Sequence, residues 1–433
     1  MFLKYFSTID FDLNSSFHRG LKKINNLARF QKFMTYFWIL GPFFYLIERD
    51  PADLWLTLIA ISFLVRSYIT KNWEWINQRW VKCTFVFWIW CIISSILSQD
   101  PIFSLQQSFV WIRFPIYAIA IQSWIGKRED FREIMLIFIF IGMMIMNLIL
   151  ITEIIVEPKH RLTWPYGDHV PGAYLAKFCL PVMCFFSSYL LSKFSFFCFK
   201  SWFILFSFLL TIIITLLTGE RINFLLLICT SILTAFVWRP KFLNVFIFIT
   251  FIFVSVVSFL HIRPDLYDRY TKIFIRQMPI LFNEQSFNEP YWGAWRSGIQ
   301  QGIETPIVGV GPSMTRKNCH NLISKNISWL PGKNYCGNHP HNFYIQIFAE
   351  TGIIGFLLGT TMMFSIIYTC FKERIYNRNN FFSATAFVIP FGIFFPLQNT
   401  NSFFGQWGNL FIWFSLAFAI SHVQNFRGKN KND

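Results

Sequence analysis

Residues 341–371 read HNFYIQIFAETGIIGFLLGTTMMFSIIYTCF and decide the class of the protein. The run is almost wholly apolar and, as a helix, is long enough to cross the roughly 30 Å hydrocarbon core of a bilayer. Its polar side chains gather near its beginning, at His341, Asn342, Gln346 and Glu350. Because polar groups are costly in hydrocarbon, this head must face protein or water. The stretch therefore predicts a membrane-spanning helix whose first turns carry polar chemistry.

The rest of the chain has the same apolar character. Its 433 residues are 54% hydrophobic and only 14% charged, whereas soluble domains carry roughly a quarter charged residues. Repeated apolar runs of roughly 20 residues predict an all-α integral membrane protein. We expect about twelve membrane-spanning helices, at 33–48, 52–69, 81–98, 104–125, 132–155, 172–192, 201–217, 221–238, 241–260, 341–371, 381–397 and 405–423.

The distribution of Lys and Arg predicts the orientation, because cytoplasmic loops are enriched in both. The short connections SQDPIFS and QNTNSFFGQ hold neither, and ERDPAD holds only Arg49. Alternate connections carry the basic clusters, within residues 4–32, 66–82, 127–132, 193–200, 239–241, 372–378 and 427–431. We therefore expect both chain ends on the cytoplasmic side.

This topology divides the chain into five parts. A basic cytoplasmic tail, 1–32, precedes the first nine spans within 33–260. One large outer loop, 261–340, mixes short helical stretches with turn signals. The last three spans follow within 341–423, and 424–433 form a second cytoplasmic tail. The formal charge of +16 comes with no long basic run and no nucleic-acid motif, so we expect a membrane and no nucleic acid as partner.

Two of the nine cysteines lie outside the apolar segments of the chain. Seven lie in or beside apolar segments, where they serve as small hydrophobes. Cys319 and Cys336 lie in the large loop, and both a disulfide and free thiols remain open. A zinc site that adds His320, His339 and His341 matches no compact ligand spacing, so we expect no metal.

His341 is the candidate general base. Proline favours the first turn of a helix, so the helix is expected to begin at Pro340 with Asn338 or His339 as its cap. A neutral imidazole has an unperturbed pKa near 6.5, which suits proton transfer at ambient pH. A histidine that only satisfies the helix end is the alternative.

Asn342, Gln346 and Glu350 lie four residues apart and therefore share one helix face. Interhelical hydrogen bonding and substrate contact both explain such a stripe. Arg113 lies within a predicted span and is a functional candidate for that reason. Pairing with Glu153 or Glu350 explains it equally well.

Two further arginines are candidates for binding an anion. Arg221 begins a span at its outer end, where a cation opposes the helix dipole, so either Glu220 or a bound anion must offset it. Arg296, on an expected amphipathic surface helix, has the planar fork that suits phosphate. Trp295 beside it suits either the membrane interface or stacking on a sugar, as do Tyr291, Trp292 and Trp329. Arg161 and Asp168 lie in a second outer connection, 157–173.

Four stretches together resemble a known family. HPHNFYIQIFAETGIIGFLLG, RLTWPYGDHVPGAYLA, the arginine of TGERINFLLLI and WRSGIQQGIETPIVGVGPSM look like the signatures of the O-antigen ligase and O-antigen polymerase superfamily. Twelve spans with a long loop before the tenth also resemble its architecture. The chain departs from the family at Glu220, where a small residue is usual before the arginine, and at PSM after the Gly-rich turn.

The resemblance implies an inverting glycosyltransferase of the GT-C type, without metal or cofactor, in the bacterial inner membrane. Its donor would be a glycan on undecaprenyl pyrophosphate, and its acceptor lipid A–core oligosaccharide at the periplasmic face. Arg221 and Arg296 would bind the pyrophosphate, and His341 would take the proton of the acceptor hydroxyl. The expected substrate contacts are Asn342, His339, Arg161, Asp168, Gln346, Trp295 and Arg113.

A ligase fits the histidine and the single large loop best. An O-antigen polymerase and a protein O-oligosaccharyltransferase of the same superfamily remain alternatives. A transporter of lipid or polysaccharide is the alternative from another class. Transporters tend to carry internal repeats and midplane binding groups, whereas this chain shows no repeat and gathers its polar groups at one face.

Overall fold

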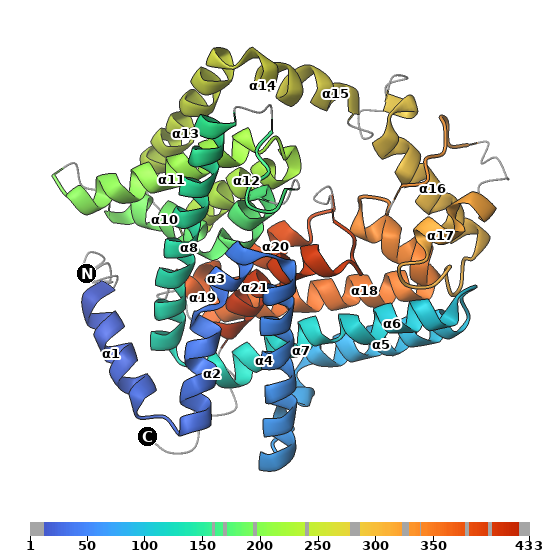
Figure 1. Cartoon of the computed structure of the whole chain (residues 1–433), viewed down its shortest axis with the longest axis horizontal. Helices are drawn as coiled ribbons and strands as arrows, with labels where there is room; N and C mark the ends of the chain where they lie inside the picture. Colours follow the sequence, from blue (N-terminus) through green and yellow to red (C-terminus); the bar gives the residue numbers. More distant parts are fainter. Residues whose placement is uncertain are drawn as a thin grey trace.

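The computed structural model describes residues 13–157, 161–167, 171–193, 197–238, 242–277, 286–322, 329–337, 339–376, 381–396 and 401–423. Within these ranges the regular secondary structure is entirely helical (Figure 1). This agrees with the fold class expected from the apolar periodicity.

Among the described residues, seven helical stretches are long and apolar enough to cross a membrane. They are Arg49–Thr70 (α4), Arg79–Ile96 (α5), Pro101–Ile125 (α6, α7 and η3), Glu129–Val156 (α8), Phe199–Leu217 (α11), Val245–Ile262 within α13 (Phe242–Ile262) and Phe343–Ile375 within α18 (Phe343–Tyr376). An eighth span results if Pro171–Phe178 and Leu180–Leu191, bent by 55° at their junction, count as one. The protein is therefore a multi-pass membrane protein.

Each of the twelve predicted segments is helical, but several are broken. The first consists of α2 (Arg29–Ile39) and α3 (Gly41–Ile47), and Pro42 favours the new start because it has no N–H to donate to the preceding turn. The eleventh consists of α19 (Phe381–Thr385) and α20 (Val388–Ile393). The twelve-span count and the extramembrane loop remain predictions.

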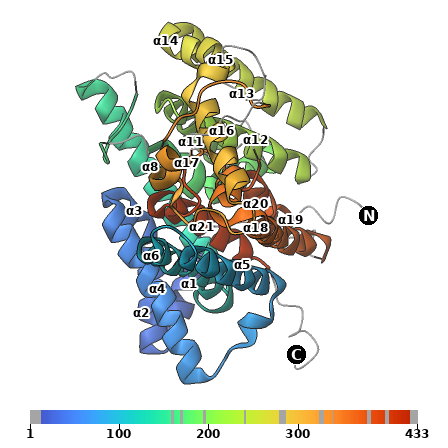
Figure 2. The ribbon, with the colours of Figure 1, turned by 90° about the vertical axis from the view of Figure 1, so that its right-hand side faces the viewer.

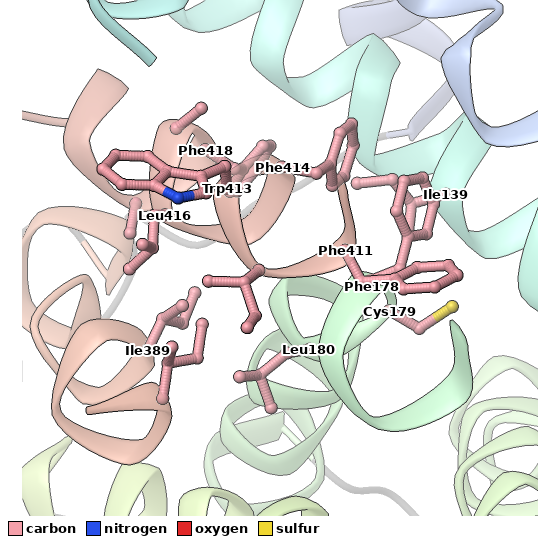
Figure 3. Close-up of a cluster of buried hydrophobic side chains, with 14 of the residues drawn as sticks. Ile139, Phe178, Cys179, Leu180, Ile389, Phe411, Trp413, Phe414, Leu416 and Phe418 are labelled. Carbon is pink, nitrogen blue, oxygen red and sulfur yellow. The ribbon is translucent and has the colours of Figure 1, made fainter. Parts of the chain in front are cut away.

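α21 (Gln406–Ser421) forms the centre of the bundle. Every residue from Asn409 to Ser421 is buried, as expected for a helix that is apolar on all sides. Its Phe414 ring stacks on Phe178 at 4.0 Å between centroids (Figure 3). Figures 1 and 2 both show α21 between the N-terminal helices and the green helices α10 (Leu180–Lys193) to α12 (Arg221–Val237).

α18 is kinked where a segment of the large loop crosses it. Gly352 has φ 67° and ψ −170°, outside the helical region. The amide of Ile353 donates to the Pro306 carbonyl at 2.7 Å, and a Cβ on Gly352 would lie 2.1 Å from the Ile307 carbonyl oxygen. Glycine is therefore required here, and the first turns of α18 are held against the loop that carries α16 (Pro290–Glu304).

Candidate functional site

The polar head of α18 is arranged differently from the prediction. The helix begins at Phe343, and Asn342 caps it: its Oδ1 accepts from the amides of Tyr344 and Ile345 at 3.0 and 3.2 Å. The expected start at Pro340, with a cap at 338 or 339, is wrong because the Asn342 side chain reaches these free amides. Asn342 also donates through Nδ2 to the Pro396 carbonyl at 2.8 Å.

His341 lies just before this cap in a left-handed backbone conformation, with φ 52°. Non-glycine residues rarely adopt this region, and those that do cluster at functional sites. Its ring centroid lies 4.3 Å from that of His339 and 5.2 Å from that of Tyr291. All three side chains are half-buried, so this group of rings remains partly exposed at the protein surface.

Tyr291, near the beginning of α16, connects His341 to a group of arginines. Arg221, the first residue of α12, donates a hydrogen bond to the Tyr291 hydroxyl. Arg161 interacts electrostatically with the same tyrosine. Arg221 and His341, which the sequence marked separately, thus both contact Tyr291, a ring that the sequence suggested only for the membrane interface or for a sugar.

Three arginines surround the turn between α11 and α12, and we call Arg161, Arg221 and Arg269 the arginine cluster. Arg161 donates through Nε to the Thr218 carbonyl at 3.4 Å. Arg269 donates through Nε to the Gly219 carbonyl at 3.0 Å. The carbonyl end of α11, where the helix dipole is negative, therefore attracts two cations.

Gly219 makes this approach possible. It has φ 68°, and a Cβ on it would lie 3.0 Å from the Arg161 Nε and 3.1 Å from the Arg269 Nε. Any side chain at this position would push both guanidinium groups away. The TG pair before Glu220 and Arg221 is therefore part of the site, because it creates the turn on which the cluster is assembled.

Like charges lie close together in the cluster, and among the described residues Glu220 is the acid that acts on Arg161. Burial lowers the pKa of Arg161, the positive charge of Arg269 lowers it further, and Glu220 opposes this effect. Glu220 Oε1 lies 3.8 Å from Arg161 Nη2. Arginine nonetheless stays protonated in proteins, so an anion bound here would relieve the repulsion among like charges.

Glu153 holds the loop that carries Arg161. Its fully buried carboxylate accepts from the Thr163 amide at 2.9 Å, from the Thr163 hydroxyl at 3.0 Å and from the Trp164 amide at 2.9 Å. Glu153 is therefore not the partner of Arg113 that the sequence suggested. Asp168, expected in the same loop, lies outside the described residues.

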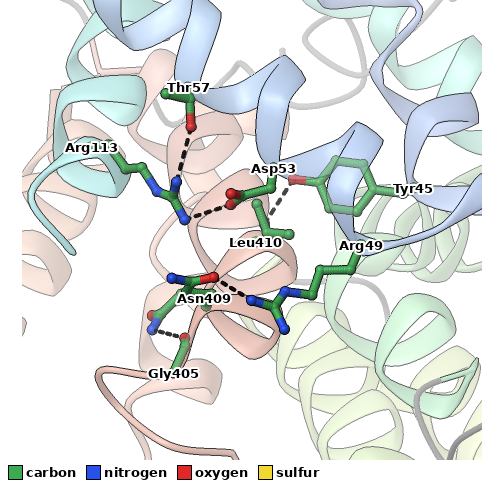
Figure 4. A network of polar contacts seen from close by, with 9 residues as sticks. Tyr45, Arg49, Asp53, Thr57, Arg113, Gly405, Asn409 and Leu410 are labelled. Carbon is green, nitrogen blue, oxygen red and sulfur yellow. Dashed lines mark hydrogen bonds and ion pairs between the residues drawn. The ribbon is translucent and has the colours of Figure 1, made fainter. Parts of the chain in front are cut away.

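Arg113 is instead paired with an acid on α4. It donates to Asp53 at 2.5 Å and to Thr57 at 3.2 Å (Figure 4). Arg113 begins α7 (Arg113–Ala120). Neither Glu153 nor Glu350 is its partner, because Glu153 accepts from the loop at Thr163 and Glu350 from the loop at Ser313. These contacts tie α7 to α4 within the bundle.

Arg296 is turned away from Tyr291 on the same helix. The two are five residues apart, which places them about 140° apart around the helix axis. Arg296 donates through Nε to the Leu330 carbonyl at 2.8 Å and through Nη1 to Asn334 at 3.0 Å. Trp295 follows Tyr291 by four residues and is also half-buried, so these two aromatic rings share one partly exposed face.

Gln346 and Glu350 make internal hydrogen bonds. Glu350 accepts from the Ser313 amide at 2.8 Å and from the Thr315 hydroxyl. Gln346 donates to Glu350 at 3.1 Å and accepts from the Phe403 amide at 2.7 Å. The stripe thereby ties the Gly-rich loop and the segment before α21 to α18.

Cys319 and Cys336 form a disulfide, with Cα atoms 5.5 Å apart. It joins α17 (Thr315–Leu322) to the segment that leads to His339 and His341. Among the residues described, no group of three or more His, Cys, Asp or Glu side chains could hold a metal ion. The disulfide also removes both thiols from the zinc set considered above.

The sequence missed Arg269, and it offered Tyr291 only as a ring for the membrane interface or for a sugar. Arg269 lies in PDLYDRYTKI, which matches no motif, and the only signals for Tyr291 were its aromatic ring and its place in the loop. Both lie far along the chain from the residues they contact. Arg269 is identified as a site residue only by its contact with the turn at Gly219, and Tyr291 only by its contacts with Arg221 and His341.

Comparison with known proteins agrees with the resemblance. Residues 206–359 match the family model described as O-antigen ligase. The matched segment includes Arg221, Arg269, Tyr291, Arg296 and His341. No curated protein matches the chain. The family match confirms the resemblance to the O-antigen ligase superfamily over this segment.

Proposed function

Proceeding from the O-antigen ligase domain at residues 206–359, we propose that the protein transfers a glycan from undecaprenyl pyrophosphate to lipid A–core oligosaccharide. The reaction takes place at the periplasmic face of the bacterial inner membrane. The observation that supports this most is the bridge formed by Tyr291 between Arg221 and His341. An anion-binding group and a candidate base are adjacent, as transfer from a lipid pyrophosphate requires.

The arginine cluster binds the pyrophosphate of the donor. Arg161, Arg221 and Arg269 offer forked N–H groups, which match phosphate oxygens bidentately. The charge on the pyrophosphate increases as its bond to the sugar breaks, and fixed cations at that place lower the barrier. We assign this role to Arg269 in place of Arg296, whose guanidinium bonds to Leu330 and Asn334.

His341 acts as the general base. Its neutral imidazole accepts the proton of the acceptor hydroxyl while the hydroxyl oxygen attacks the anomeric carbon. The new glycosidic C–O bond forms as the bond from that carbon to the pyrophosphate oxygen breaks, and undecaprenyl pyrophosphate leaves with its bonding electrons. Attack opposite the leaving group inverts the anomeric centre. The arginines stabilise the leaving charge, so the proposed reaction uses no metal ion or cofactor.

The remaining candidate residues form two groups that differ in how exposed their side chains are. Trp295 and His339 remain partly exposed beside Tyr291 and His341, and we assign them to contact with the sugars. Asn342, Gln346 and Arg296 are buried and bonded to neighbouring segments, so we assign them to holding the site in shape.

The test compares the lipopolysaccharide of cells lacking the protein with their lipid-linked glycan. A ligase predicts loss of the surface ladder while long undecaprenyl-linked chains accumulate. Lipid A–core capped by single repeat units would identify a polymerase instead. A normal ladder would contradict both and direct the search to a protein acceptor.

Complementation with variants tests the residue assignments. We expect His341→Ala to lower transfer by at least about 100-fold, the usual contribution of a general base, while the donor still accumulates. His261→Ala, at the exposed end of α13, serves as the matched control and should restore the ladder. A normal ladder with His341→Ala at normal protein levels would exclude the base assignment.

A further inference from the structure

Glu220 precedes Arg221 and lies directly at the arginine cluster. Its Oε1 lies 3.8 Å from Arg161 Nη2, which is within ion-pair distance but too long for a hydrogen bond. Its Oε2 accepts from the Asn223 amide group. A Cβ on Gly172 would lie 3.0 Å from the Glu220 Cβ, so the stem of this side chain is packed, while the ion pair between Glu220 and Arg161 is a long one.

A buried lysine interacts with this carboxylate. Lys177 is fully buried, and its ammonium has no hydrogen-bond partner among the described residues. Glu220 interacts with it electrostatically. A buried ammonium is costly unless an opposite charge accompanies it, and among the described residues Glu220 supplies such a charge.

The backbone around Lys177 is also unusual. It belongs to a π-helical turn, Tyr174–Phe178 (η4), next to the 55° bend before α10. Turns of this type inside helices occur frequently at functional sites. The segment 171–178 packs against α12, whose first residue is Arg221. The segment that carries Lys177 thus packs against the helix that begins directly after Glu220.

We propose that Glu220 is a resident counter-ion of the arginine cluster, which the pyrophosphate of the donor displaces, and that Lys177 retains the displaced carboxylate inside the protein. This inference rests on the proposed function of the cluster. Without donor, Glu220 offsets part of the repulsion among three arginines. With donor, the phosphate oxygens take over Arg161, and Lys177 keeps Glu220 from repelling them. Glu220 and Lys177 are positioning residues in this account.

The test measures inhibition of glycan transfer by inorganic pyrophosphate, with the purified full-length protein in lipid nanodiscs. A loose ion pair is worth up to about 1 kcal/mol. We therefore expect Glu220→Gln to lower the inhibition constant about two- to fivefold. A merely structural role of Glu220 would not make pyrophosphate bind more tightly. An unchanged or raised constant would overturn the inference.

Lys177 is tested in the same assay. Lys177→Met should raise the inhibition constant, because Glu220 then pairs more strongly with the arginines. The double variant Lys177→Met/Glu220→Gln should return to the low constant of Glu220→Gln. If Lys177→Met does not fold, Lys177→Arg retains the charge and should resemble the wild type. Failure of the double variant to return would overturn the role of Lys177.

Arg269→Gln separates this inference from the proposed function. It should raise the inhibition constant, because it removes one cation from the cluster. If it does so and Glu220→Gln changes nothing, the cluster binds pyrophosphate and only the counter-ion inference fails. If neither Arg269→Gln nor Arg221→Gln affects inhibition, the proposed anion site fails, and the counter-ion inference fails with it.

Discussion

The ring of Tyr291 lies 5.2 Å from the ring of His341, and the Tyr291 hydroxyl accepts a hydrogen bond from Arg221. One side chain of α16 therefore contacts both halves of the candidate site. Its ring and its hydroxyl make separate contacts, so one substitution can remove the hydroxyl contact alone and another can remove both contacts.

Tyr291→Phe keeps the ring beside His341 and removes only the hydroxyl. We expect the KM for the lipid-linked donor to rise about fivefold, since a hydrogen bond is worth about 1 kcal/mol net, with little change in kcat. Tyr291→Ala removes both contacts and should also lower kcat. Steady-state kinetics of the purified protein distinguish the two variants, and equal effects of both on kcat would contradict this division.

Arg269→Gln should weaken donor binding more than substitution of an arginine outside the cluster. Loss of one charge-assisted contact to phosphate costs about 1.5–3 kcal/mol, which corresponds to at least about a tenfold rise in KM. Arg276, paired with Glu289 in the same part of the chain, provides the control. Equal KM values for Arg269→Gln and Arg276→Gln would remove Arg269 from the site.

The disulfide between Cys319 and Cys336 should stabilise the segment that carries the two histidines. The cysteines are 17 residues apart, and closing a loop of that length is worth about 3 kcal/mol. Cys336→Ser should lower the melting temperature in detergent and the rate of transfer. Cys229→Ser, at an exposed cysteine of α12, is the control. Reactivity of both cysteines with a maleimide before reduction would show that they are not bridged.

Gly352→Ala should destabilise the protein strongly, by more than about 2 kcal/mol, because left-handed strain adds to a clash. The new Cβ would lie 2.1 Å from the Ile307 carbonyl oxygen. Gly167 is the matched control: it has φ 65°, but nothing lies within 4 Å of its Cβ position. Gly167→Ala should cost only about 1 kcal/mol. Equal melting temperatures of the two variants would contradict the crossing at Gly352.

Local sequence predicted the site in part. His341 and Arg221 were identifiable because polar or cationic residues at the start of an apolar helix are costly without a purpose. The interhelical role of Gln346 was one of two interpretations that the spacing left open. The start of α18 was predicted wrongly, because Pro340 favoured one cap while Asn342 provides another.

The sequence by itself determined that this is an all-helical membrane protein and that its candidate chemistry includes His341 and Arg221. Transfer of apolar side chains into lipid depends on local composition, which a single sequence displays completely. Tertiary structure decided which arginines surround the turn at Gly219, that Tyr291 joins them to His341, and that Arg113 pairs with Asp53. These contacts join segments far apart along the chain, so they depend on how the helices pack and not on any local pattern.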